Sequence, residues 1–514
     1  MDAKRLAIFC GATMLLLSPA FTLSCPAQQK QDTAGSRSAA PTNAEDRSAR
    51  LELEMQAVMT ALNETKRQLE DSHQQIEELR QELSNLSAKL PDSSQVTSAD
   101  AAGQSAADLR EAVAGLQESG EILQAEVKQH EQTKIESLSK YPVKISGLVL
   151  FTSSLNNGTV DDVDSPVFAI AHMPSISRGS LTATARQSIF GLDAKGPHLW
   201  GAESAADVRF DLFGGFPTAG YDPNAGLVRM RTAHFQLEWP QTSVVASFDS
   251  PLISPLRPTS FVTVGQPALA WSGNLWSWAP QLAVKHRFQA ASQGGSAVEL
   301  GFIDPSVSVV QTIGGIRQPT AGESSRQPGY ESRMQYGFGA GDHPIVVGVG
   351  GYFARQRYED KQNIDAWAGT ADWQAPFGSW LQVSGEFYRG QAIGGLGGGA
   401  FKDVIVTSPS DHARGFDAVG GWTQIKTRLT SSLEANAAAG QDNGFSHELR
   451  SANPLPNAGV YSGLVRNRTF LGNLIYRPRA YLLLSAEYRN IHTWQIVGPA
   501  SQANVVGLAA GYLF

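Results

Sequence analysis

From Lys144 to the C-terminus, apolar and polar residues alternate with a period of two, and this pattern restricts the fold more than any other feature of the chain. A typical segment is 207–212, which reads Asp-Val-Arg-Phe-Asp-Leu. Successive side chains of a β-strand point to opposite faces, so each such segment has one apolar face and one polar face. Repeated over the whole region, the alternation predicts an all-β transmembrane barrel with lipid outside and water inside.

Sixteen such segments can be counted, an even number, as a single-chain bacterial barrel with both ends on the periplasmic side requires. The strands are therefore expected to run antiparallel to their neighbours around the barrel. Their approximate bounds are 144–155, 187–195, 202–213, 227–238, 243–248, 280–288, 297–305, 331–339, 344–358, 366–377, 380–393, 416–429, 432–443, 467–478, 481–494 and 504–514.

The links between these segments alternate in length. If the first strand runs outward, the odd-numbered links are long external loops and the even-numbered links are short periplasmic turns. Only 359–365 is short among the external links, and only 289–296 is long among the turns. Because the strand count did not impose this alternation, it supports both the count and the direction of the strands.

The 514-residue chain is modestly polar, with a mean hydropathy of −0.20 and 17% charged residues. This composition excludes a bundle of transmembrane helices, each of which needs about 20 nearly continuous apolar residues. The net charge of −7 comes from residues 1–140, which hold 14 Lys/Arg against 21 Asp/Glu, while the remainder holds 27 of each. Without a basic excess, nucleic acid is not an expected partner.

Residues 1–27 are typical of a secretory signal peptide, with a positive start, an apolar stretch and small residues before Ala27. Cleavage after Ala27 would remove Cys10 and Cys25, the only cysteines, so no disulfide is expected in the mature chain. The alternative is that Cys25 carries a lipid, although the residues before it fit a lipoprotein signal poorly.

Residues 28–50 are rich in Gln, Ser, Thr and charge, which predicts a flexible leader. Residues 51–140 then carry a helical signal in two parts, broken near 91–105. A seam of alternating four- and three-residue steps drives helices to wrap around one another, which predicts a periplasmic α-helical coiled coil and favours an oligomer over a single amphipathic helix. The first seam consists of Leu51, Met55, Val58, Leu62, Thr65, Leu69, Ser72, Ile76, Leu79, Leu83, Leu86 and Leu90.

The barrel is expected to occupy residues 141–514, and the chain ends in Gly-Tyr-Leu-Phe. Tyr512 and Phe514 share one face of the last strand. A terminal aromatic residue after an alternating strand resembles the signal that the barrel-assembly machinery of the outer membrane reads. That machinery and the outer-membrane lipid are therefore expected partners, the first through Phe514.

A barrel of this size leaves an aqueous channel, whose selectivity depends on inward-facing charges and on any loop that folds into the lumen. The candidates for the pore lining are polar-face residues of several strands. They are Asp207, Arg209, Asp211, Lys285, Arg287, Glu386, Arg389, Lys426, Arg428, Glu487 and Arg489. Basic residues modestly outnumber acidic ones on the polar faces, which favours anionic solutes. Arg229 and Arg231 share the parity of Phe235 and Leu237, a conflict that only a bulge or a subunit contact would remove.

The third external link, at about 249–279, is rich in proline and aromatic residues, which stiffen a loop and let it pack. We expect it to be the constriction loop, and the alternative is an external cap that never enters the pore. The residues expected to act at the constriction are Phe261, Trp271, Trp276 and Trp278.

The heptad-rich N-terminal extension and two short segments of the barrel together resemble the DcaP-like trimeric porins. The segments are 185–191, Ala-Arg-Gln-Ser-Ile-Phe-Gly, and 228–233, Val-Arg-Met-Arg-Thr-Ala. The resemblance implies a sixteen-stranded barrel, a homotrimer and the uptake of small, often anionic, organic solutes, with Arg186 and Gln187 as family-pattern positions. Phosphate-selective porins share the general plan, but this chain lacks their dense ladder of arginines.

The sequence thus predicts a porin in the outer membrane of a Gram-negative-type bacterium, through which small hydrophilic solutes diffuse. An enzyme is not expected, because the ten histidines are scattered and no catalytic, metal-binding or cofactor motif accompanies them. The acidic run at 161–164 is read as a solvated turn rather than a calcium site. The stronger alternative is a tethering protein, whose coiled coil grips the cell wall or a periplasmic partner while the barrel only anchors it.

Overall fold

The computed structural model describes residues 142–215, 226–288, 295–304, 312–313, 316–339, 344–358, 362–405, 413–451 and 463–514. The predicted signal peptide, leader and coiled coil lie outside these residues. Among the described residues, no helix is both long enough and apolar enough to cross a membrane.

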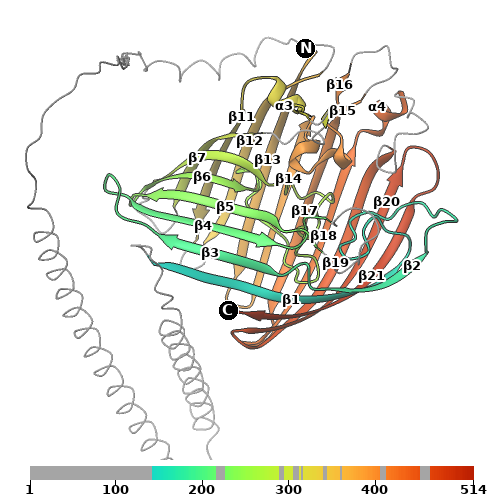
Figure 1. Cartoon of the computed structure of the whole chain (residues 1–514), viewed down its shortest axis with the longest axis horizontal. Helices are drawn as coiled ribbons and strands as arrows, with labels where there is room; N and C mark the ends of the chain where they lie inside the picture. Colours follow the sequence, from blue (N-terminus) through green and yellow to red (C-terminus); the bar gives the residue numbers. More distant parts are fainter. Residues whose placement is uncertain are drawn as a thin grey trace, which may run out of the picture. The chain divides into compact units, whose positions relative to one another are not determined.

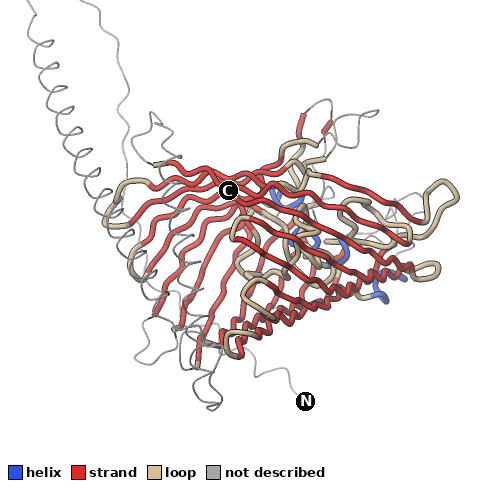
Figure 2. The backbone as a smooth tube through the Cα atoms, turned by 90° about the horizontal axis from the view of Figure 1, so that it is seen from below, coloured by secondary structure: helices blue, strands red, loops and turns tan. Residues whose placement is uncertain are grey.

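The described region forms one closed antiparallel sheet (Figures 1 and 2). The sheet closes where the first strand pairs with the last, from Leu148↔Leu513 to Asn157↔Asn504. Its wall consists of β1 (Val143–Asn157), β2 (Gly179–Thr184), β3 (Ile189–Lys195), β4 (Glu203–Asp211), β5 (Arg229–Glu238), β6 (Thr242–Asp249), β7 (Ala279–Phe288), β8 (Ser296–Ile303), β11 (Gly329–Phe338), β12 (Ile345–Arg357), β13 (Asn363–Phe377), β14 (Leu381–Gln391), β17 (Asp417–Arg428), β18 (Leu433–Gly444), β19 (Leu464–Arg479), β20 (Leu482–Gln495) and β21 (Ser501–Leu513).

Two of these strands, β2 and β3, share one position in the wall. β2 pairs with the second half of β1, and β3 pairs with its first half. The wall therefore has the sixteen positions that the alternation predicts, and the predicted barrel is confirmed. The sequence predicts a loop at 156–186, and this prediction is wrong for β2, because the break at residues 185–188 interrupts the alternation.

The long links carry short elements that the sequence did not predict. They fall between β8 and β11, between β14 and β17, and between β18 and β19. They are β9 (Thr312–Ile313), β10 (Ile316–Arg317), α3 (Ala321–Ser324), η1 (Gly394–Leu396), η2 (Gly399–Phe401), β15 (Val404–Ile405), β16 (Arg414–Gly415) and α4 (Ser446–Ser451). We call the end of the barrel that bears the long links the loop rim, and the other end the turn rim.

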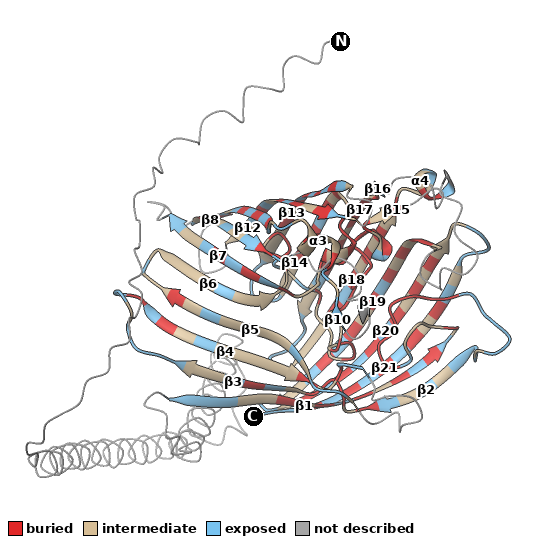
Figure 3. Cartoon of the chain, turned by 45° about the horizontal axis from the view of Figure 1, so that its top comes forward, coloured by how far each residue is buried: buried red, intermediate tan, exposed pale blue. Residues whose placement is uncertain are grey.

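Burial along the strands shows which face of the wall is outside. In β19–β21, exposed and buried residues alternate, as the blue and red bands of Figure 3 show. Across the middle of the wall the large exposed side chains are apolar, which is the composition that lipid contact requires. They include Phe151, Phe190, Phe235, Leu282, Phe302, Val349, Phe387, Phe470, Leu484 and Leu508.

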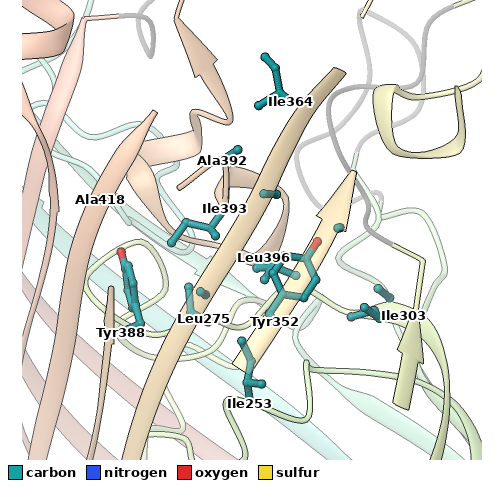
Figure 4. Close-up of a cluster of buried hydrophobic side chains, with 14 of the residues drawn as sticks. Ile253, Leu275, Ile303, Tyr352, Ile364, Tyr388, Ala392, Ile393, Leu396 and Ala418 are labelled. Atoms are coloured by element: carbon teal, nitrogen blue, oxygen red, sulfur yellow. The ribbon is translucent and has the colours of Figure 1, made fainter. Parts of the chain in front are cut away.

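The buried apolar side chains lie on the inner face, between the wall and three loops that fold inward, the first of which is the link between β1 and β2. We call residues 250–278 loop L3 and residues 392–416 loop L6. The largest cluster joins Ile253 and Leu275 of L3 to Ile393 of L6 and to Tyr352 and Tyr388 of the wall (Figure 4). The interior is therefore partly filled by loops, and the filling is apolar where loop meets wall.

A buried carboxylate on β18 anchors loop L6. Asp442 accepts hydrogen bonds from the Tyr388 hydroxyl at 2.5 Å and from the backbone N–H groups of Gly399 and Ala400 at 3.2 and 2.9 Å. Gly420 on the neighbouring strand leaves room for the Tyr388 ring, since a Cβ there would lie 2.6 Å from it. The glycine-rich turn η2 of L6 is thus held against the wall.

Replacing Asp442 with alanine is expected to destabilise the barrel by about 3 kcal/mol, because three buried donors lose their acceptor. The measurement is the thermal unfolding midpoint of the full chain in detergent. Gln441→Ala, on the outer face one residue away, is the matched control and should unfold with the native chain. Equal midpoints for all three proteins would show that Asp442 does not anchor L6.

Candidate functional site

Loop L3 does not cap the barrel but runs along its inner wall. Its first half starts at β6 and makes hydrogen bonds to one strand after another. The Leu252 N–H donates to Glu331 at 3.2 Å, and the Thr259 N–H donates to Gln424 at 2.6 Å. The partners, in the order in which L3 meets them, are Glu331 of β11, Glu386 of β14, Gln424 of β17, Asn473 of β19, Glu487 of β20 and Gln187 before β3.

Apolar contacts also hold L3 against the wall and against L6. Val262 is fully buried among Leu148 and Leu150 of β1 and apolar residues of β19–β21. Trp271 stacks on Phe401 of L6, with ring centroids 3.7 Å apart, and meets Trp276 edge-on at 5.9 Å. L3 is therefore packed on both sides, and it occupies the half of the interior that faces β11–β21.

Three residues predicted to line the pore lie beneath inward-folded loops instead, Glu386 and Glu487 beneath L3 and Arg489 beneath the link between β1 and β2. Glu386 accepts hydrogen bonds from the Ser254 hydroxyl and the Leu256 N–H, and Glu487 accepts one from the Ser260 hydroxyl. Arg489 donates to the Pro166 carbonyl and is 4% exposed. All three face inward, but the prediction that they line the water path is wrong. Strand parity assigns a face and cannot show which part of that face a loop covers.

The opposite wall, from β3 to β7, keeps charged side chains partly exposed, and β5 and β6 are largely tan in Figure 3. Arg209 pairs with Asp193 at 2.5 Å. Asp207 lies 3.1 Å from the Nδ1 atom of His234. Lys285 pairs with Glu299 at 2.8 Å. The candidates Asp207, Arg209 and Lys285 thus share the half of the interior that L3 leaves open.

A β-bulge in β5 resolves the parity conflict that the sequence poses. Arg209 pairs with Thr232 and Phe210 pairs with Met230, so Arg231 is an extra residue in the ladder. A bulge places the residues on either side of it in a new alternation. Arg229 and Arg231 consequently point inward, although they share the parity of the outward-facing Phe235.

The two arginines share one carboxylate and one aromatic ring. Arg229 and Arg231 lie 2.7 and 3.0 Å from Asp211, which is 1% exposed. Both guanidinium groups lie over the Trp278 ring, at 5.0 and 4.9 Å from its centroid. We call Arg229 and Arg231 the arginine pair. Two positive charges beside the one negative charge of Asp211 leave a net charge of +1 at the pair.

Both members of the arginine pair also hold L3. Arg229 donates to the Gly265 carbonyl and Arg231 to the Val264 carbonyl, each at 2.5 Å. Arg229 remains 25% exposed and Arg231 11% exposed. The arginine pair therefore lies where the far point of L3, at Val264 and Gly265, meets the charged wall. Part of each guanidinium group is accessible to solvent.

A second charged group lies beside the arginine pair. His234 bridges two carboxylates, with Nδ1 and Nε2 each 3.1 Å from oxygens of Asp207 and Asp249. Only the doubly protonated ring can donate to both. Arg257 of L3 donates to Asp249 at 2.7 Å. This network ties β4, β5 and β6 to the first turn of L3.

The remaining candidates for the pore lining lie near the ends of the wall. Arg287 pairs with Glu238 at 3.1 Å, and Lys426 lies 3.8 Å from Glu434. Arg428 stands at the end of β17, at the turn rim.

Arg389 faces outward, on the parity of Phe387, so the prediction that it lines the pore is wrong. It pairs with Asp417 at 3.0 Å and lies over the rings of Trp367 and Phe445. The alternation of β14 itself places Arg389 on the apolar face, with Phe387.

The family-pattern residues sit in the break between β2 and β3. Arg186 forms a buried ion pair with Asp164 and lies 4.6 Å from the centroid of the Phe213 ring. Gln187 is fully buried, and its amide binds L3 at three backbone atoms. It donates to the Val262 carbonyl at 2.9 Å and accepts from the N–H groups of Val264 and Gly265 at 2.6 and 2.7 Å. Gln187 thus holds the far point of L3.

Two ionisable residues of L6 are also buried. Burial raises the pKa of Asp403 to about 7, although the backbone N–H of Gly395 and the Gln356 amide donate to it. Burial likewise lowers the pKa of Lys402 to about 7. In the described part of the chain, no three His, Cys, Asp or Glu residues are grouped as a metal site would require.

A closed sixteen-position antiparallel barrel, apolar outside and with its third loop folded inside, has the architecture of the porin class of channels. The outer membrane channel DcaP of Acinetobacter baumannii is 15% identical to this chain, with 74% of this chain and 99% of that chain covered and a TM-score of 0.55. An anion-selective porin from Comamonas acidovorans is 11% identical, with 73% and 100% covered and a TM-score of 0.45.

No protein-family model and no curated protein sequence matches this chain. The similarity to DcaP shows a shared fold, and the resemblance to DcaP-like porins expected from the sequence is confirmed at that level.

Proposed function

We propose that the chain is an outer-membrane porin through which small hydrophilic solutes diffuse. The observation that carries this proposal is the unequal covering of the inner wall. L3 covers inward polar side chains of β11–β20, such as Glu331, Glu386 and Gln424, yet charged side chains of β3–β7, such as Asp193, Asp207 and Arg209, remain partly exposed. A water-filled path between L3 and this wall is the arrangement that a diffusion channel uses, with L3 as its constriction.

The apolar outer band places the barrel in a membrane, and a membrane β-barrel of this kind belongs to the outer membrane. DcaP, which shares the fold, is itself described as an outer membrane channel. The loop rim then faces the exterior and the turn rim the periplasm. Phe514 pairs with Gly147 at the turn rim through hydrogen bonds of 2.9 and 3.1 Å, a position that suits the proposed recognition by the barrel-assembly machinery.

Anionic solutes are the favoured class. The arginine pair carries a net positive charge and exposes guanidinium surface, and guanidinium groups bind carboxylates and phosphates in a two-point geometry. Trp278 beneath the pair adds an apolar surface for the rest of an organic anion. The proposed solute is therefore a small organic anion.

The test is the unitary conductance of the purified full chain in a planar lipid bilayer. Stepwise ohmic currents that scale with salt concentration are the expected result. A tethering protein predicts no current, or steps too small for an aqueous lumen, and that outcome would remove the porin proposal.

Native mass measurement of the same preparation tests the proposed homotrimer, and removal of residues 51–140 tests whether the heptad seam assembles it.

A further inference from the structure

The outer surface of the barrel carries two adjacent arginines near the loop rim. Arg466 and Arg468 lie on β19 and share the outward parity of Phe470, which is 47% exposed. Cross-strand pairing places Arg466 between Asn443 and Trp494, and Arg468 between Gln441 and His492. The two guanidinium groups therefore belong to the lipid-facing side of the wall, above its apolar band.

No carboxylate of the described chain lies within salt-bridge distance of either arginine. Arg466 donates to the Asn443 amide oxygen at 2.6 Å, and its guanidinium lies over the Trp494 ring. Arg468 lies over the rings of Phe470 and Trp494, and its buried Nε donates to no acceptor among the described residues.

The sequence of the adjoining link supports this absence, because residues 452–462 contain no Asp or Glu. Two other outward arginines at the same rim do have carboxylate partners. Arg355 pairs with Asp365 at 2.7 Å, and Arg389 pairs with Asp417 at 3.0 Å. The charge on Arg466 and Arg468 is thus left available to an anion from outside the chain.

Two hollows on the outer wall share Thr423 and Ala439, and together they form a groove that runs from the cross-strand partners of the two arginines toward the middle of the barrel. Neither arginine lines the groove itself. Gln441 and Asn443, the cross-strand partners of the two arginines, line its near end. Its floor is made of small residues, and Phe387, Ile425, Phe470 and Tyr488 stand beside it. The floor residues are Gly421, Thr423, Ala437, Ala439 and Gly472.

We propose that this surface binds a phosphorylated lipid of the outer leaflet, with its phosphate at Arg466 and Arg468 and one acyl chain in the groove. Guanidinium–phosphate pairs are strong and geometrically specific, and basic sites on membrane proteins select anionic headgroups. The inference rests on the outer-membrane location proposed above, but it does not depend on whether the barrel conducts.

A second copy of the chain fits the surface less well than a lipid does. Such a partner would need outward-facing carboxylates opposite the two arginines. Among the described residues of the wall strands, the outward carboxylates are Asp365 and Asp417, and both already pair with arginine. Charge complementarity therefore favours the lipid phosphate.

The test is native mass spectrometry of the purified full chain, titrated in detergent with diphosphorylated lipid A. The double variant R466Q/R468Q is expected to lower the affinity for lipid A at least tenfold. Ala439→Phe, which fills the groove without changing charge, should lower it as well. Arg355→Gln is the matched control, since it removes an outward arginine elsewhere on the rim and should leave the affinity unchanged.

Titration with dephosphorylated lipid A distinguishes the contribution of the phosphates to the affinity from that of the acyl chains. R466Q/R468Q should bind it as the native chain does, whereas Ala439→Phe should bind it less well. The proposal is overturned if R466Q/R468Q keeps the native affinity for lipid A, or if Arg355→Gln weakens it equally. It is also overturned if R466Q/R468Q alters only the oligomer mass, because the surface would then be a contact between copies. Unchanged thermal midpoints exclude misfolding as the cause.

Discussion

Replacing L3 with a short turn is expected to raise the unitary conductance of the barrel, by a factor of roughly two or more, because the narrowest segment of a pore sets its resistance. The replacement is geometrically simple. Asp249 and Ala279, which flank L3, are directly paired on β6 and β7, so a four-residue hairpin turn can join them. The measurement is single-channel recording of the full-length variant in a planar bilayer.

A point variant tests whether the attachment of L3 to the wall, and not only the presence of the loop, affects the conductance. Gln187→Ala removes the side chain that binds the far point of L3 at Val262, Val264 and Gly265. The loop stays in the chain but loses this attachment, so we expect noisier currents with a smaller rise in conductance. Gln441→Ala on the outer face should behave as the native chain does. If the L3 replacement folds and conducts at the native level, L3 is not the constriction.

Much of the fold was predictable, because the alternation along a strand and the length of a link depend only on residues that are close together in the sequence. The middle of β19–β21 shows why, since outward positions there, such as Phe470, Leu484 and Leu508, are apolar, and the turn between β19 and β20 is short. The break between β2 and β3 was not predictable in the same way. There, Arg186 and Gln187 are fixed by partners in distant loops, Asp164 and Val264, which no local pattern reveals.

The site was less predictable than the fold. Parity correctly turns Asp207 and Arg209 inward, but it also nominated Glu386 and Glu487, which L3 covers. The arginine pair was missed because one extra residue in β5 reverses the face of Arg229 and Arg231. The conflict of parity was itself the signal, since two arginines on an apolar face require either a bulge or a partner.

Arg229→Gln is expected to lower the ratio of anion to cation permeability about threefold. The substitution removes the net positive charge of the arginine pair, and it leaves Arg231 to compensate the buried Asp211. A unit charge about 6 Å from a passing ion in water contributes ~0.7 kcal/mol, and screening over a Debye length of about 8 Å roughly halves this value. Because the sign is opposite for an anion and a cation, the two halves add to ~0.7 kcal/mol, which corresponds to about threefold in the permeability ratio. The measurement is the reversal potential across a gradient of potassium chloride.

Arg389→Gln is the matched control, because it removes the same charge from the outward face of β14. Its reversal potential should equal that of the native channel, since the low-dielectric wall and the salt solution separate Arg389 from the lumen. Asp211→Asn should move the reversal potential in the opposite direction to Arg229→Gln. Without the carboxylate, the net positive charge at the arginine pair rises from +1 to +2. Opposite shifts for these two variants, with none for Arg389→Gln, would locate the selectivity at the arginine pair. Equal shifts for Arg229→Gln and Arg389→Gln would instead mean that the charge of the whole barrel, and not this part of its wall, decides which ions pass.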